Sequence, residues 1–256
     1  MKVVFWSLVG TAILGVILAL VGMGIYGFDF DAMAADLHGD HHHEARSISL
    51  DDLDMSATIN ISVRSQNLVV REGTEFRIDY YYNTRRSNIE YSIYNGVFSA
   101  EFERNWRFGI VNWPRSRHVT VTLTLPAGFD GILNLESRSG NKNIGAINAE
   151  SINLVARSGN TTINRATANS ISVESRSGNT TINRATADVI NVTARSGNNR
   201  ITVVGNRTDH HIVTSNRSGN TRIDGRRMGS SHTEGAGQVR QITMTVRSGN
   251  NTLNFV

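Results

Sequence analysis

The amino-acid sequence predicts an all-β protein, a single-stack β-solenoid similar to a parallel β-helix, with about 19 residues in each coil. The main observation is the tetrapeptide Arg-Ser-Gly-Asn, which occurs six times at steps of 19, 19, 19, 22 and 30 residues. A fixed period near twenty, with a glycine in every unit, is typical of coils that stack and bury each other's apolar side chains. We therefore expect each repeat to form one coil.

Apolar residues at fixed distances from each Arg predict two strands in every coil. Those at positions five and three before the Arg alternate with polar residues, as in a half-buried strand, and only Thr214 interrupts the series. Two insertions, 204–211 and 225–240, fall between the core positions, so we expect loops that leave the register unchanged. The sixth residue after each Arg is always apolar: Ile144, Ile163, Ile182, Ile201, Ile223 and Leu253.

The Ser-Gly-Asn segment of each repeat is predicted to form the turn, because glycine accepts backbone angles that other residues resist. Stacking at about 4.8 Å brings the asparagines into one column, in which side-chain amides can hydrogen-bond to the copies above and below. The alternative is a row of ligand-binding asparagines. The turn and ladder residues are Gly140, Asn141, Gly159, Asn160, Gly178, Asn179, Gly197, Asn198, Gly219, Asn220, Gly249 and Asn250.

The arginines of the repeat form a second predicted column, which is the candidate ligand-binding surface. Residues 138–256 hold 15 basic and 6 acidic side chains, whereas residues 1–137 hold 11 basic and 16 acidic ones. The solenoid should therefore attract anions. One interpretation is solubility and protection of strand edges; the other is contact with an acidic surface polymer, phospholipid headgroups or nucleic acid. The six arginines are Arg138, Arg157, Arg176, Arg195, Arg217 and Arg247.

The N-terminal segment, residues 1–28, is predicted to be a transmembrane anchor. Residues 3–28 form an uncharged run of 26 residues, longer than the roughly 20 that a bilayer requires. Lys2 precedes this run, and the next basic residue is Arg46, which favours an extracytoplasmic C-terminal domain. A cleaved secretory signal, with 32–34 as the cleavage site, is the alternative.

Residues 29–46 are predicted to be an acidic, histidine-rich linker. Its histidines are adjacent to Asp40 and Glu44, a composition that can hold zinc, copper or nickel, or respond to pH. A solvated linker without bound metal is the other interpretation. The candidate metal ligands are His38, His41, His42 and His43.

Residues 47–135 are predicted to be an aromatic-rich β region that forms the N-terminal part or cap of the same solenoid. A second interpretation is a carbohydrate-stacking surface built from Trp106 and Trp113 in the loop 104–117. Seven strands are expected, at 47–50, 57–63, 68–71, 76–82, 89–94, 97–103 and 119–125.

Residues 136–256 form the regular part of the predicted solenoid. Its last repeat begins at Arg247 and the sequence ends at Val256, half a coil later. We expect the last coil to be uncovered, which would allow end-to-end association and a homo-oligomer through strand pairing. Alternatively, Phe255 folds over the end.

Catalytic residues are not evident, so we expect a non-enzymatic protein without cofactors. The sequence has no cysteine and no phosphate-binding glycine loop before a helix. Within the repeat region, Asp209-His210-His211 is the densest group of catalytic or metal-binding residue types, and it lies in an insertion. A polysaccharide-acting β-helix enzyme is the lower alternative. The acids of the repeat region are scattered over different coil positions: Glu150, Glu174, Asp188, Asp209, Asp224 and Glu234.

An N-terminal anchor, a β region that ends in the segment 118–128, and repeated strand, Ser-Gly-Asn, strand units resemble the bacterial putative-adhesin family of β-strand-repeat solenoids. The resemblance covers residues 47–256. It implies a cell-envelope domain of unknown function without demonstrated catalysis, and some members are similar to membrane proteins associated with envelope stress. Every turn carries Asn rather than Asp, which argues against a calcium-binding array.

Together these features predict a single-pass protein of the bacterial cell membrane with an extracytoplasmic solenoid. We expect an adhesin-like or scaffolding module whose basic face binds an acidic envelope polymer. The alternative is an accessory protein of an envelope-stress system that acts through contact with a membrane sensor protein. No specific nucleic-acid partner is expected.

Overall fold

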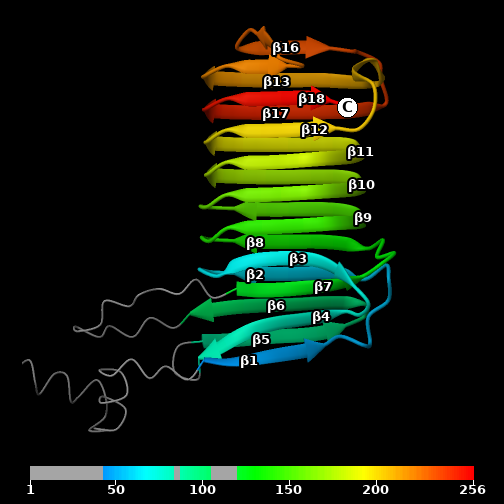
Figure 1. Cartoon of the computed structure of the whole chain (residues 1–256), viewed down its shortest axis with the longest axis vertical. Helices are drawn as coiled ribbons and strands as arrows, with labels where there is room; N and C mark the ends of the chain where they lie inside the picture. Colours follow the sequence, from blue (N-terminus) through cyan, green and yellow to red (C-terminus); the bar gives the residue numbers. More distant parts are fainter. Residues whose placement is uncertain (1–42, 84–86, 105–119) are drawn as a thin grey trace, which may run out of the picture. The chain divides into compact units, whose positions relative to one another are not determined.

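The computed structural model describes residues 43–83, 87–104 and 120–256, which contain strands, turns and one short 3-10 helix, η1 (Arg207–Asp209) (Figure 1). Most of them belong to one compact unit. The predicted anchor, residues 38–42 of the histidine cluster, and the segment that contains Trp106 and Trp113 lie outside the described residues. Across the described ranges, no helix has the length and apolar character needed to span a bilayer.

The strands form two ladders, one on each side of a stack of coils. In stacking order, the first ladder contains β5 (Ser87–Tyr94), β6 (Val97–Arg104), β2 (Thr58–Val63), β8 (Ile132–Ser137), the second halves of β9 (Lys142–Ala156), β10 (Thr161–Ser177) and β11 (Thr180–Ser196), then β17 (Arg240–Ser248), β13 (His210–Ser218) and β16 (Ser231–Glu234).

The second ladder lies across the core from the first. It contains β1 (His43–Ser49), β4 (Arg77–Asn83), β7 (Thr120–Pro126), β3 (Asn67–Gly73), the first halves of β9, β10 and β11, then β12 (Asn199–Val203), β18 (Asn251–Phe255), β14 (Thr221–Ile223) and β15 (Arg226–Met228). Each of the seven strands predicted before residue 136 is present. In the repeats, β9, β10 and β11 continue around one corner, so only the Ser-Gly-Asn turn interrupts the strand.

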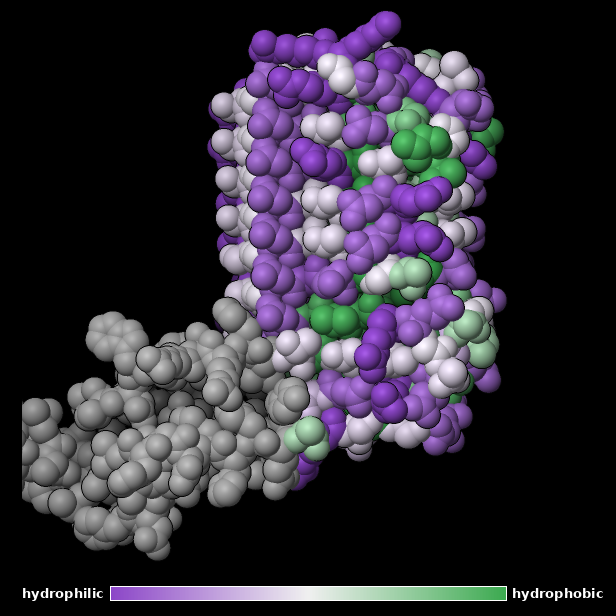
Figure 2. All heavy atoms as spheres, viewed as in Figure 1, coloured by the Kyte–Doolittle hydropathy of each residue, from purple (hydrophilic) through white to green (hydrophobic). Residues whose placement is uncertain are grey.

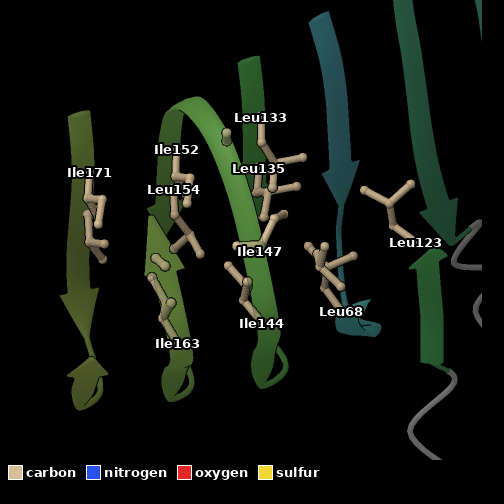
Figure 3. Close-up of a cluster of buried hydrophobic side chains, with 14 of the residues drawn as sticks. Leu68, Leu123, Leu133, Leu135, Ile144, Ile147, Ile152, Leu154, Ile163 and Ile171 are labelled. Carbon is tan, nitrogen blue, oxygen red and sulfur yellow. The ribbon is translucent and has the colours of Figure 1, made fainter. Parts of the chain in front are cut away.

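The repeat sets the register of the stack. Ile163 pairs with Ile144 on one side and Ile182 on the other, and all three side chains are fully buried. Figure 3 shows such side chains from successive strands pointing into the same core, with Ile152 and Ile171 on the opposite ladder. Burial of each leucine or isoleucine stabilises the fold by roughly 1.5–3 kcal/mol. The period of 19 residues is therefore the path length of one coil.

Both ends of the stack contain one coil out of sequence order. The coil of β2 and β3 lies between β6/β7 and β8/β9. The C-terminal coil of β17 and β18 lies between β11/β12 and β13/β14 (Figure 1). The expectation that the last coil is uncovered is wrong. The second insertion, 225–240, is long enough to carry the chain back across the preceding coil, so the C-terminal strands have partners on both sides.

Antiparallel strands complete each end. The β5–β6 hairpin turns at Asn95 and Gly96, with φ of 49° and 72°. The β14–β15 hairpin turns at Asp224 and Gly225, with φ of 48° and 77°. Both sequences and both pairs of positive φ values are typical of the two-residue type I′ turn. The chain thus leaves the parallel coil path through a tight hairpin at either end.

The N-terminal end is filled with aromatic side chains. Phe76 packs edge-on against Phe129 with ring centroids 6.0 Å apart, and Tyr80 packs against Phe102 at 5.5 Å. These rings are buried. Aromatic pairs of this geometry stabilise a core by roughly 0.5–1.5 kcal/mol beyond their burial.

Ion pairs hold the C-terminal end. Arg207 of η1 donates two hydrogen bonds of 2.6 Å to the carboxylate of Glu234 on β16. The guanidinium also lies 3.5 Å from Asp224, and the ring of His232 lies 3.0 Å from Glu234. The hydrogen bonds from Arg207 lower the pKa of Glu234 from 4.5 to about 2. The two insertions are therefore joined to each other.

A column of polar side chains runs inside the core next to the turn. Lys142 is 1% exposed, and its Nζ donates to the carbonyl oxygens of Gly140 at 2.9 Å and Ser158 at 2.8 Å. Burial lowers the pKa of Lys142 to about 8. The column then continues through buried side chains in the successive coils, at Thr161, Thr180, Asn199, Asn251 and Thr221.

Candidate functional site

The six arginines of the repeat lie in one exposed column on the first ladder, at the edge where each strand enters its turn. The residues beside them pair directly: Ser175 with Ala194, Ala194 with Val246, and Val246 with Asn216. Adjacent guanidinium groups therefore start from Cα atoms about 4.8 Å apart. All six side chains are exposed. In stacking order they are Arg138, Arg157, Arg176, Arg195, Arg247 and Arg217.

None of these six arginines forms an ion pair with another residue in the described part of the chain. Figure 2 shows hydrophilic side chains repeating as vertical columns along the stack. A column of exposed cations at strand spacing repels itself, because like charges opposite each other across strands are unfavourable. An anion that bridges neighbouring guanidinium groups would relieve this repulsion.

The residue two positions before each Arg faces the same side and forms a flanking column. This column changes character along the stack, because it begins with Glu136, Val155 and Glu174 and then continues with hydroxyl groups. The hydroxyl residues are Thr193, Thr245 and Ser215, which pair with one another in that order.

A groove of roughly 470 Å³ runs between the flanking column and the arginine column. Its walls include four arginines, the three hydroxyl residues and, at one end, Glu174. It crosses β10, β11, β17 and β13, so it follows the direction in which the coils stack. We call it the basic groove. Its cationic and hydroxyl groups can bind an extended anion.

The turn beside the basic groove depends on close approach of glycine backbones. The six turn glycines have φ between 89° and 140°. A Cβ atom on Gly178 would lie 2.2 Å from the carbonyl oxygen of Gly159, and the same close approach recurs from coil to coil. Only glycine allows this stacking, which fixes the backbone that carries each arginine.

The asparagines next to these glycines also form a column, and its hydrogen bonds differ from the predicted side-chain ladder. The Oδ1 atom of Asn160 accepts a hydrogen bond of 3.0 Å from the backbone N–H of Asn179. The same bond recurs along the column, from Asn67 to Asn220. The side-chain oxygens thus accept hydrogen bonds from backbone N–H groups in the turn. Among the described residues of this column, side-chain N–H groups donate to a neighbouring Asn only at Asn198 and Asn250.

Sequence reasoning missed a seventh turn of the same kind. Arg64-Ser65-Gln66-Asn67 occupies the next position in the column, where the carbonyl oxygen of Gln66 faces Gly140. The backbone N–H of Ser139 donates to Arg64. The signal was present in the sequence, since apolar Ile59, Ile61 and Val70 have the repeat spacing, but Gln replaces the glycine that defined the motif.

A second, larger groove of roughly 660 Å³ lies on the same ladder toward the N-terminal end. Its floor carries an amide ladder in which Asn134 donates to Asn60 at 2.8 Å and Asn153 donates to Asn134 at 2.9 Å. Glu101 and Glu136 line its side. These amides are engaged with each other, and the carboxylates have the wrong charge for an anion.

The triplet Asp209-His210-His211 does not assemble into a site. His210 is 1% exposed, its Nδ1 lies 2.9 Å from the carbonyl oxygen of Asn206, and its ring packs against Phe255. Neighbouring residues of a strand face opposite sides, so His211 lies on the outer surface. Across the described residues, no group of three His, Cys, Asp or Glu side chains has a metal-binding arrangement.

One solved structure supports this architecture, and a second is similar to a lower degree. A solved structure described as a putative cell adhesion protein from Clostridium sporogenes is similar over 83% of this chain and 98% of its own, with 11% identity and a TM-score of 0.50. A putative adhesin from Bacteroides fragilis matches over 83% of this chain and 96% of its own, with 12% identity and a TM-score of 0.45. At these identities the first likeness concerns the fold alone. A comparison with curated proteins returned no match.

A family model described as Toastrack DUF4097 matches residues 56–233. The match includes strands of both ladders from β2 to β15, the out-of-order N-terminal coil and five of the six Arg-Ser-Gly-Asn turns. It covers more than half of the chain. The protein belongs to the Toastrack DUF4097 family.

Proposed function

We propose that this protein is a non-catalytic adhesin-like or scaffolding module, held in the bacterial membrane by residues 3–28, whose basic groove binds an acidic polymer of the cell envelope. The observation that carries the proposal is the column of six exposed arginines without intramolecular ion pairs in the described residues. The long apolar N-terminal run supports the anchor. The name of the similar fold from Clostridium sporogenes, a putative cell adhesion protein, is consistent with an envelope role.

Rigid spacing is the physical reason for polymer binding. The arginines sit on strands whose register is fixed by buried isoleucines and by glycine turns. A preorganised surface loses little conformational freedom on binding, so more of the interaction energy appears as affinity. A repeating ligand can bind several guanidinium groups at once, and this multivalency raises the overall affinity above that of a single contact.

The test is binding of the full chain, in mild detergent, to isolated acidic cell-wall polymer, to vesicles with anionic phospholipid and to DNA across a salt series. The variant Arg176→Gln/Arg195→Gln/Arg247→Gln, in which all three residues line the basic groove, should weaken polymer binding by about tenfold or more, and added salt should weaken binding by the wild type. The matched control, Arg165→Gln/Arg184→Gln/Arg200→Gln, removes the same charge outside the basic groove.

Two results would contradict the proposal. If the wild type does not bind the wall polymer, the basic groove does not have the proposed function. A membrane sensor protein would then be the partner to test. Equal losses in the two triple variants would indicate attraction to net charge without a defined site.

A further inference from the structure

Three adjacent coils of the basic groove present the same pair of groups. Each strand carries a hydroxyl residue followed, two positions later, by an arginine on the same face. The pairs in stacking order are Thr193 with Arg195, Thr245 with Arg247, and Ser215 with Arg217. These three pairs are neighbours only because β17 lies between β11 and β13. In the sequence, the pair on β13 comes before the pair on β17.

The remaining coils of the column lack this pairing. Glu136 lies two positions before Arg138, and Glu174 lies two positions before Arg176. On these strands a carboxylate therefore lies on the same face as the guanidinium group. Val155 takes that position before Arg157. Both strand neighbours of Val155 are these glutamates, whereas in the hydroxyl column only Thr193 adjoins one of them. The local positive charge is therefore least compensated on β11, β17 and β13. Glu174 lines the groove at its β10 end, where it would repel an anion.

The hydroxyl column determines which anion fits best. A guanidinium binds a carboxylate through two parallel hydrogen bonds. A serine or threonine hydroxyl can both donate and accept, which matches the hydroxyl groups of a sugar. A polyphosphate chain has charged oxygens on all sides and no hydroxyl donors. A ligand with carboxylates along one edge and hydroxyls along the other is an acidic polysaccharide.

We propose that the three hydroxyl–arginine coils form a binding site for a linear acidic polysaccharide that lies along the stack, with its carboxylates on Arg195, Arg247 and Arg217. This inference rests on the proposed function, because it names the class of polymer that the basic groove takes. Buried Ala194 and Val246 lie between the two columns on their strands and give the groove a floor of fixed backbone.

The hydroxyl column supplies a test that leaves the charge unchanged. The variant Thr193→Val/Thr245→Val/Ser215→Ala keeps all arginines and introduces residues that strands tolerate. Full-length wild type and variant are compared for binding to polygalacturonate, a linear polymer of uronic acid, and to linear polyphosphate. We expect about a fivefold loss of affinity for polygalacturonate, with polyphosphate affinity changed by less than about twofold. Equal melting temperatures confirm that the fold is retained.

Position within the column is tested by two triple variants of equal charge. Arg195→Gln/Arg217→Gln/Arg247→Gln should lose at least about tenfold in polygalacturonate affinity, whereas Arg138→Gln/Arg157→Gln/Arg176→Gln should lose about threefold or less. Equal losses in both would overturn the three-coil site.

The two proposals fail in different ways. If the hydroxyl variant binds both polymers as the wild type does, or loses both equally, the polysaccharide assignment is wrong, although arginine-dependent binding of an acidic polymer still stands. If neither arginine variant alters binding to any polyanion, the proposed function fails as well.

Discussion

The two ends of the stack use the same backbone device and opposite side-chain chemistry. At each end, a coil from one terminal region of the fold is inserted one level inward, and an antiparallel hairpin with a type I′ turn completes the ladder. Aromatic rings fill the N-terminal end, whereas Arg207, Glu234 and Asp224 join the loops of the C-terminal end. Chain topology therefore ends the solenoid, and the side chains only reinforce it.

Among the changes that test this comparison, removal of the inserted C-terminal coil should reduce stability the most. Deletion of residues 240–256 takes away Ile242, Met244 and Leu253, all fully buried, and separates β11/β12 from β13/β14. Loss of each such side chain costs about 2–5 kcal/mol, and the total is as large as the net stability of a typical domain. We expect no cooperative thermal transition by circular dichroism.

A single substitution at exposed Val239, just before this coil, serves as the control and should leave the melting temperature unchanged. A truncated chain that melts like the wild type would mean that β13 and β14 can stack directly on β11 and β12. The insertion would then be dispensable for closing this end.

Glycine-to-alanine substitutions should destabilise the protein more in the middle of the stack than at its C-terminal end. Gly178→Ala places a Cβ atom 2.2 Å from the carbonyl oxygen of Gly159, so the coils must move apart. Gly225→Ala, in the C-terminal hairpin, also has a positive φ, but apart from its two chain neighbours no residue lies within 4 Å of the added Cβ atom. We expect about 3 kcal/mol or more of destabilisation for Gly178→Ala and about 1 kcal/mol for Gly225→Ala, measured by urea unfolding. Equal losses would show that backbone strain alone requires glycine in the turns.

The sequence predicted the register of these coils but could not predict their order. The spacing from arginine to the apolar positions aligns Ile163 with Ile182, as the structure shows. The last two coils, however, offer equivalent apolar positions to β11, with Ile212 in one and Ile242 in the other. Periodicity cannot distinguish which of them stacks first, so the inserted coil and the covered end were missed.

For the candidate site, the sequence likewise predicted which residues form a column but not which coils are neighbours. The arginine column follows directly from the repeat, because residues at one repeat position must stack. The neighbours that distinguish one arginine from another depend on coil order, so Thr193 and Thr245 become adjacent only in the structure. Lys142 was also missed, since a lysine in an alternating strand is normally an outward-facing residue.

The ion cluster at the C-terminal end should make that end sensitive to acid. Glu234 has a pKa lowered from 4.5 to about 2, so its contribution to stability is present above pH 4.5 and is lost as the pH falls toward 2. We expect Glu234→Gln to destabilise the protein by about 2–3 kcal/mol at pH 7 and by much less at pH 2. Urea unfolding at a series of pH values measures this difference.

Asp188→Asn is the matched control, because Asp188 lies 3.6 Å from Arg240 in an exposed ion pair, which contributes about 0–1 kcal/mol. A difference between wild type and Glu234→Gln that stays constant from pH 7 to pH 2 would contradict the role of this carboxylate at the C-terminal end.

A substitution in the interior column next to the turn should change stability the least, and it should stabilise the protein. At the N-terminal end this column is apolar, with Val121 and Leu68. From Lys142 onward it is polar, and the buried hydroxyl of Thr180 has no hydrogen-bond partner among the described residues. Thr180→Val keeps the shape and removes the unpaired hydroxyl, so we expect a gain of about 1 kcal/mol in unfolding free energy.

Leu68→Thr is the reciprocal change at the apolar end of the same column and should destabilise the fold by about 2 kcal/mol or more, because it removes buried apolar surface and adds a buried hydroxyl. If Thr180→Val destabilises the protein instead, the hydroxyl is hydrogen-bonded in solution. The polar half of the column would then contain ordered water, and the contrast between the two ends would extend to the hydration of their cores.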